Sequence, residues 1–311
     1  MVLRISDLNI RGSLPELPRS IALLEVHIPT FEERRWCIAT VGRRLGLGKM
    51  NLVEVPHGHI FGSPKGEVEF FRASGAIWAS DTTADEKFKN EARPWKRLRT
   101  TGRGHDKAFT LDRDQLAKLT DSSLEFLRES GLLREEASRP TIKLDQWAHL
   151  NEQGEEIERG AGTATVELGY EVEGITAIGP GAKTVLFAEP VNGIAGISGM
   201  FHAWRDIIGA REVKMQSIED ALKVGLLEDP ELISYHKRGH RIEIVRIRLG
   251  YLALPVFVQQ SHLFPAFEVQ GVVHDSEDKR RSFSFGKYCH AASPEQYVKT
   301  GVAASYLIRP L

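Results

Sequence analysis

The stretch SIEDALKVGLLEDPELISYHKRGHRIEIVRIRL, residues 217–249, decides the fold because a helical pattern passes into a strand pattern within it. Ser217 is a residue type that caps helix starts, and Leu222 belongs to the apolar face that follows. We expect this short helix to end at Gly225, since glycine accepts the left-handed conformation of a helix stop. Apolar residues then recur at alternate positions over 241–249, which predicts a strand.

The same order, a helix followed by turn-punctuated strands, occurs twice more along the chain. Thr30 and Glu33 have the spacing of a capping box, and the helix they begin is expected to end at Gly46. Asp112 begins another helix that is expected to end at Gly131. The strands expected after the three helices are 67–71 and 75–78; 163–172, 174–178, 184–187 and 193–197; and 241–249, 256–258, 266–269 and 282–285.

This pattern predicts an α+β protein built from tandem lobes, each a helix packed on an antiparallel β-meander. An internal repeat fits the similar helix ends at Gly131 and Gly225, although a glycine before an apolar residue is also what any helix stop requires. The predicted units are an N-terminal lobe at 1–85, a basic linker at 86–108, a middle lobe at 109–210 and a C-terminal lobe at 211–311.

Composition excludes several classes of protein. The 311 residues include 41 Lys and Arg against 42 Asp and Glu, a balance that fits neither a disordered chain nor a globally basic nucleic-acid binder. The weakly polar stretches 190–204 and 249–258 are shorter than the roughly 20 residues that span a bilayer, and residues 1–7 do not resemble a secretory signal. We expect a cytoplasmic protein without membrane contact, in which Cys37 and Cys289 are buried and unbonded.

No complete catalytic or metal-binding motif is present in the sequence. Residues 179–184 end in Lys-Thr after glycines but lack P-loop spacing, so a hairpin turn is expected there. His57 and His59 have no third metal ligand at a suitable spacing. Cys289 and His290 are adjacent in an expected strand and therefore point to opposite faces. The sequence predicts no metal and no cofactor, and it favours a binding protein over an enzyme.

Basic residues gather in the linker between 87 and 107. Arg97, Arg99 and Arg103 are the candidates there for contact with an acidic partner, and a solvated loop is the alternative. Binding to nucleic acid is disfavoured because no nucleic-acid-binding fold signature accompanies the run.

The C-terminal third resembles the YycH/YycI-like regulatory proteins, whose lobes are similar to PepSY modules. A glycine-rich stretch at 193–205 ends in Trp-Arg, a Ser-capped helix follows at 217–222, a strand ends at Tyr251, and a Pro-aromatic segment occupies 264–271. The resemblance implies binding of a peptide or protein without catalysis. Members of that family have an N-terminal membrane anchor; none is expected here, which suggests a cytoplasmic derivative rather than a regulator of a sensor kinase.

One role that suits such a derivative is that of an accessory protein that binds a precursor peptide in the biosynthesis of ribosomal-peptide natural products (RiPPs). Pro255 and Pro265 predict an incomplete sheet edge, because proline cannot donate a hydrogen bond into a ladder, and edges accept extended peptides. The predicted ligand-binding residues are Trp204, Arg205, Tyr251, Phe264 and Phe267, with Arg205 able to clamp a carboxylate.

Two other hypotheses remain open at the level of the sequence. The first is a hydrolase or peptide-tailoring enzyme whose groups meet only in space, with His202 or His262 as general base. The second is a homo-oligomer held together by pairing of sheet edges.

Overall fold

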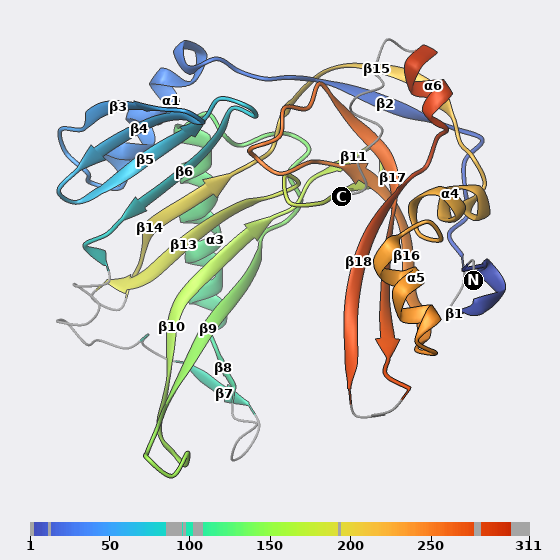
Figure 1. Cartoon of the computed structure of the whole chain (residues 1–311). Helices are drawn as coiled ribbons and strands as arrows, with labels where there is room; N and C mark the ends of the chain where they lie inside the picture. Colours follow the sequence, from blue (N-terminus) through green and yellow to red (C-terminus); the bar gives the residue numbers. More distant parts are fainter. Residues whose placement is uncertain are drawn as a thin grey trace.

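The computed structural model describes residues 3–11, 14–84, 95, 98–101, 108–191, 194–276 and 281–299. Within these residues the chain is an α+β protein with one large antiparallel sheet, one large mixed sheet, a two-stranded antiparallel pair and five α-helices (Figure 1). The α+β class predicted from the sequence is therefore confirmed.

The antiparallel sheet has eight strands and is covered on one face by two helices. Helix α1 (Phe31–Arg44) packs on β5 and β6, and α3 (Arg113–Glu129) packs on β14. Apolar residues of the helices and the sheet, among them Val41 and Phe126, form one buried cluster. In spatial order the strands are β3 (Asn51–Val55), β4 (Gly58–Ser63), β5 (Gly66–Phe71), β6 (Ala76–Asp81), β14 (Ile194–His202), β13 (Thr184–Val191), β10 (Glu156–Leu168) and β9 (Thr141–Leu150).

The mixed sheet follows the path β11 (Glu171–Val172), β12 (Ile175–Ile178), β16 (Arg241–Leu252), β17 (His262–His274), β2 (Ser20–His27) and β15 (Asp206–Lys214). Two further strands attach to it, β1 (Leu8–Ile10) on β16 and β18 (Ser282–His290) on β17. Helices α4 (Ile218–Gly225) and α5 (Pro230–Lys237) pack on β18 and β16, and α6 (Pro294–Lys299) contacts β15. A 3-10 turn, Ile5–Asp7, precedes β1, and β7 (Arg99–Thr101) pairs with β8 (Ala108–Thr110).

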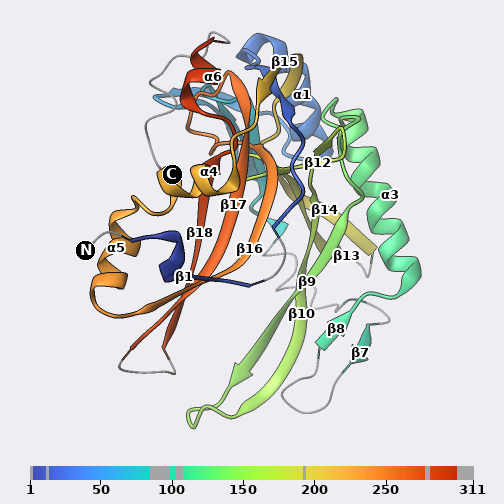
Figure 2. The ribbon, with the colours of Figure 1, turned by 90° about the vertical axis from the view of Figure 1, so that its right-hand side faces the viewer.

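Helices lie on opposite sides of the molecule with the two sheets between them, α3 on one side and α4 with α5 on the other (Figure 2). The expectation of purely antiparallel meanders is corrected in the mixed sheet, where β1 and β12 pair with β16 in parallel. Both strands reach β16 from distant parts of the chain, and a parallel pair requires such a crossover rather than a hairpin.

Strand pairing also crosses the predicted lobe boundaries. Strand β6 of the predicted N-terminal lobe pairs with β14 of the middle lobe, and β2 pairs with both β15 and β17. Strand β12 of the middle lobe pairs with β16 of the C-terminal lobe. Each sheet thus combines segments that the sequence assigns to different lobes. The four predicted units, as independent folding units, stay a prediction.

The predicted helix starts are confirmed. The Thr30 hydroxyl accepts a hydrogen bond from the Glu33 amide, and the Glu33 carboxylate accepts one from the Thr30 amide. Asp112 and Gln115 form the same reciprocal pair at α3. Ser217 caps α4 by accepting from the amide of Asp220.

The predicted helix stops are correct in position, and one is wrong in mechanism. Gly46 and Gly131 are left-handed, with φ of 72° and 68°. Gly225 ends α4 without a positive φ. Glycine is needed there for lack of space, because a Cβ at this position would lie 2.6 Å from the Cys289 Sγ. The chain then enters α5, a helix that the sequence reading did not predict.

The expected strands hold with one exception, 256–258, which forms a turn. The expected strand at 163–172 is divided, because β10 ends at Leu168 in the antiparallel sheet and β11 begins at Glu171 in the mixed sheet. Cys37 and Cys289 are buried and unbonded, as predicted. Within the described ranges, no helix is both long and apolar enough to cross a membrane.

Phe126 provides a test of the helix-on-sheet core. Its side chain is buried between α3 and the antiparallel sheet, so Phe126→Ala should lower the free energy of unfolding by about 3–5 kcal/mol. Leu116, on the same helix but 37% exposed, is the matched control, and Leu116→Ala should change stability by less than about 1 kcal/mol. Urea unfolding of both variants checks the difference, and equal losses would contradict this packing.

Candidate functional site

The two sheets meet where β14 runs directly into β15. The three connecting residues, Ala203, Trp204 and Arg205, are almost completely buried. His202 pairs with Thr184 of the antiparallel sheet, and Asp206 pairs with His27 of the mixed sheet. We call residues 202–206 the junction.

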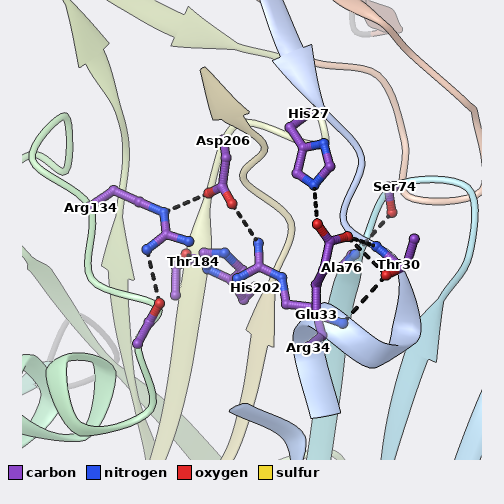
Figure 3. Close-up of polar contacts among 11 residues, drawn as sticks. His27, Thr30, Glu33, Arg34, Ser74, Ala76, Arg134, Thr184, His202 and Asp206 are labelled. Atoms are coloured by element: carbon purple, nitrogen blue, oxygen red, sulfur yellow. Dashed lines mark hydrogen bonds and ion pairs between the residues drawn. The ribbon is translucent and has the colours of Figure 1, made fainter. Parts of the chain in front are cut away.

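Asp206 ties the junction to both helices of the antiparallel sheet (Figure 3). Its carboxylate accepts from Arg34 Nη2 of α1 at 3.2 Å and from Arg134 Nε, just after α3, at 2.6 Å. Arg134 also donates to the carbonyl of Gly131 at 2.9 Å. Burial raises the pKa of the Asp206 carboxyl, but the Arg134 hydrogen bond and the two arginine charges outweigh burial and hold this pKa below its usual range.

A chain of hydrogen bonds runs beside this ion pair. The Tyr170 hydroxyl lies 2.5 Å from the Thr184 hydroxyl, which lies 2.7 Å from His202 Nδ1. Burial, reinforced by the nearby positive charges of Arg34 and Arg134, lowers the pKa of His202 to about 3. The ring is therefore neutral at physiological pH, and its contact is with Thr184 inside the protein rather than with solvent.

Four of the five predicted ligand-binding residues lie in the interior, and none of these four lines the pockets of the Tyr251 region, of Trp78 or of the start of α1. Trp204 stacks on Tyr170 with ring centroids 4.2 Å apart. Arg205 donates to the carbonyl oxygens of residues 254, 255 and 258 at 3.1–3.3 Å, so its guanidinium holds the turn between β16 and β17. Phe264 and Phe267 belong to different buried clusters. The structure does not bring the five together at one surface site, and ligand binding by these four stays a prediction.

Tyr251, the fifth, lines a pocket of about 350 Å³. The pocket lies between the β2–β15 pair and the β11–β12 hairpin, with Tyr251 of β16 between them. Its lining consists of Pro18, Ser20, Ile21, Ala22, Glu173, Ile175, Ala210, Arg211, Glu212 and Tyr251.

The position of this Tyr251 pocket follows from the topology of the mixed sheet. Strands β11 and β15 are the two ends of the main strand path, and the pocket is lined by β15 and by the turn that follows β11. On one side the lining includes Glu173, in the turn after β11; on the other it includes Ala210 and Glu212 of β15. The sheet therefore curls until its ends face each other across the pocket.

Tyr251, a lining residue of the pocket, carries an unsatisfied polar group. The side chain is fully buried, and its hydroxyl has no hydrogen-bond partner in the structure. Burial, together with the negative charge of Glu173, raises the pKa of the phenol to about 12, so it stays protonated at physiological pH. A buried hydroxyl without a partner costs free energy, which a ligand with a polar group could recover.

Two other pockets differ from the Tyr251 pocket in how far their polar side chains are buried. In a pocket of about 420 Å³ beside Trp78, Glu189 accepts from the Thr163 hydroxyl and Ser198 donates to a backbone carbonyl. The lining of a pocket of about 280 Å³ at the start of α1 includes Phe31 and His59. The Nδ1 of His59 has no hydrogen-bond partner either, but this side chain is only half-buried. Of the three, only the Tyr251 pocket has a fully buried side chain with an unpartnered polar atom.

The remaining sequence-predicted residues are separate from this site. Arg97 and Arg103 lie outside the described residues, and Arg99 is exposed in β7. His262, the second candidate base, is 8% exposed and lies 3.0 Å from the Ser261 hydroxyl. Among the residues with described positions, no group of three or more His, Cys, Asp or Glu could hold a metal ion.

Sequence reasoning selected Tyr251 but missed its neighbours in the pocket. Ser20 and Glu212 belong to β2 and β15, which the sequence reading did not recognise as strands. Glu173 did carry a local signal, since it precedes Gly174 between two short apolar runs, a pattern typical of a tight hairpin turn.

Comparison with known proteins identifies no family. No protein-family model and no curated protein matches the chain. Among solved structures, an uncharacterized protein from Eubacterium rectale ATCC 33656 matches with a TM-score of 0.48 and 10% sequence identity, over 89% of this chain and 84% of that one.

Removing the charge of Asp206 should destabilise the protein. Asp206→Asn leaves Arg34 and Arg134 without their anionic partner, and we expect a loss of about 2–3 kcal/mol in unfolding free energy at pH 7. Because the folded-state pKa is lowered, this contribution is present above the unfolded Asp pKa of about 3.9 and is lost as pH falls through the folded value. The gap between wild type and variant should therefore narrow in acid.

Urea unfolding at several pH values measures that gap. Glu129→Gln is the control, since it removes one partner of the exposed Arg44–Glu129 pair and should cost less than about 1 kcal/mol. A gap for Asp206→Asn that is independent of pH would contradict the ion-pair assignment.

His202 should remain neutral far below the usual pKa of histidine. We expect its ring signals in nitrogen-15 NMR to show the neutral form down to about pH 4. Since the folded-state pKa is lowered, His202 should destabilise the fold as pH drops below the unfolded value of about 6.5. His202→Gln assigns the signal and should weaken this pH dependence; a wild-type ring that titrates near pH 6 would refute the assignment.

Proposed function

We propose that the protein binds a peptide segment in extended form without changing it chemically, with one side chain of the peptide in the Tyr251 pocket. The observation that carries the proposal is the position of this pocket beside β15, a strand that ends the sheet path. A strand at a sheet edge offers unpaired backbone groups to an added strand, while pockets beside the edge select alternate side chains.

Strand β15 has features that suit such an edge. Ala210 and Glu212, two positions apart, both line the pocket, so the ladder and the pocket could be used together. A register shift lies between Ile207 and Gly209, and bulges of this kind are common where a strand redirects a side chain near a binding site. Ile208, within that shift, is 62% exposed and offers an apolar contact beside the edge.

We further propose that the segment from α4 to β18 is a PepSY-like lobe of the kind that the sequence resemblance implies. Its order supports this, since α4 and α5 are followed by three successive antiparallel strands on which they pack. The biological role that fits is an accessory protein that binds a precursor peptide in RiPP biosynthesis, acting in the cytoplasm where such peptides are synthesised.

A variant that fills the pocket tests the binding proposal. Ala210 is exposed at the pocket wall, so Ala210→Trp should block the pocket without disturbing the core. The control is Val224→Trp, which adds an indole at a 62% exposed position on α4. Both variants and the wild type, as full-length protein, are used to select from a display library of random peptides.

We expect the wild type and Val224→Trp to enrich the same peptides and Ala210→Trp to enrich none of them. Hydrogen–deuterium exchange should then show slower exchange of the β15 amides when a selected peptide binds. The proposal fails if Ala210→Trp selects the same peptides as the wild type, or if the protein selects none. Light scattering separates peptide binding from the alternative of edge pairing between two copies.

A further inference from the structure

We propose that the Tyr251 pocket recognises a primary ammonium group on an alkyl chain, as in a lysine side chain or the free N-terminus of a peptide. This inference rests on the proposed function and concerns which ligand chemistry the site selects. Three observations support it: apolar walls, an excess of carboxylates, and the unpartnered hydroxyl of Tyr251.

The walls are suited to an alkyl chain. Pro18, Ile21, Ala22, Ile175 and Ala210 contribute apolar surface from strands on both sides. A lysine side chain combines four methylene groups with a compact charged end, so its stem can contact apolar residues while its ammonium meets polar groups.

Carboxylates outnumber cationic groups in the lining. Glu173 and Glu212 come from opposite sides of the pocket, and Arg211 is the cationic member of the lining. The Arg211 guanidinium lies 4.0 Å from the Glu25 carboxylate, which offsets its charge. A negatively charged ligand group would be repelled here, whereas an ammonium group would be paired with carboxylates as it leaves water.

Local structure orients the Glu212 carboxylate and fixes the backbone at Glu173. The Ser20 hydroxyl donates a hydrogen bond to Glu212 Oε1. Glu173 has a φ of 52°, the one positive value among non-glycine residues with described backbones. Together with the φ of 79° at Gly174, this value belongs to the two-residue turn between β11 and β12, which fixes the point from which the Glu173 side chain extends.

The Tyr251 hydroxyl supplies an acceptor that a neutral apolar ligand would not use. An ammonium group has three N–H donors and no acceptor, so it can donate to the phenol oxygen and to carboxylates together. Binding would give a partner to a buried hydroxyl that has none in the structure. The pocket therefore offers an ammonium group both a hydrogen-bond acceptor and opposite charge.

The test uses the same random-peptide display library with a charge-neutral variant of the pocket. In Glu173→Gln/Glu212→Gln the shape is kept and both charges are removed. The matched control, Glu152→Gln/Glu228→Gln, removes the same charge at two exposed positions outside the lining. Peptides selected by the wild type are then synthesised, and their binding to all three proteins is measured by calorimetry.

We expect the wild type to select peptides with a lysine or a free N-terminus at one constant position. The pocket variant should bind them about tenfold or more weakly, since charge-assisted hydrogen bonds are lost, and the control should bind them like the wild type. Tyr251→Phe should also weaken binding, while the folded protein becomes no less stable because an unpartnered buried hydroxyl is removed.

Two chemical modifications identify the source of the ammonium group. Acetylation of the lysine should abolish binding if the side chain enters the pocket, and acetylation of the N-terminus should do so if the terminus enters. Selected peptides that bind equally well to the wild type and to Glu173→Gln/Glu212→Gln would overturn the inference and leave peptide binding intact. A library from which nothing is selected would overturn both.

Discussion

A carboxylate that is three-quarters removed from water needs compensating charge, and Asp206 meets that requirement with two arginines from different parts of the chain. Arg34 comes from α1 and Arg134 from the turn after α3, so one carboxylate connects both helices of the antiparallel sheet to the first residue of β15. The placement of β15 relative to the helices depends on this ion pair. Because the Tyr251 pocket has β15 as one wall, the site depends on it as well.

Arg205 complements this arrangement from the other side of the junction. Its guanidinium donates to three carbonyl groups of the turn that joins β16 to β17. The carbonyl of residue 255 also accepts from the Val258 amide, and Arg205 adds a donor for the carbonyls of residues 254 and 258. Val256 and Phe257 of this turn contact the antiparallel sheet through Phe71, so the turn also bridges the two sheets. Sequence reasoning assigned Arg205 to a ligand carboxylate. In the structure its guanidinium donates hydrogen bonds to backbone carbonyl oxygens.

Much of the fold could be predicted from local sequence patterns, whereas the site is formed by contacts between residues that are distant in sequence. The caps at Thr30 and Asp112 and the alternation at 241–249 could be read directly, because each depends on neighbours within a few residues. Strand β15 was missed because Gly209 and a register shift interrupt its alternation. The partners of Asp206 are 172 and 72 residues away, and no sequence signal joins them. Tyr251 was selected through a family resemblance, but its place beside Glu173 and Glu212 follows from the curl of the sheet.

The two cysteines lie one beneath each layer of helices. Cys37 belongs to α1 over the antiparallel sheet, and Cys289 of β18 lies against Gly225 of α4 over the mixed sheet. Burial raises the pKa of both thiols to about 12, so neither reacts while its helix is in place. The rate at which a thiol reagent labels each cysteine therefore reports separately on the opening of each half of the molecule. The native chain thus contains two chemical reporters, which can show whether the halves open together or independently.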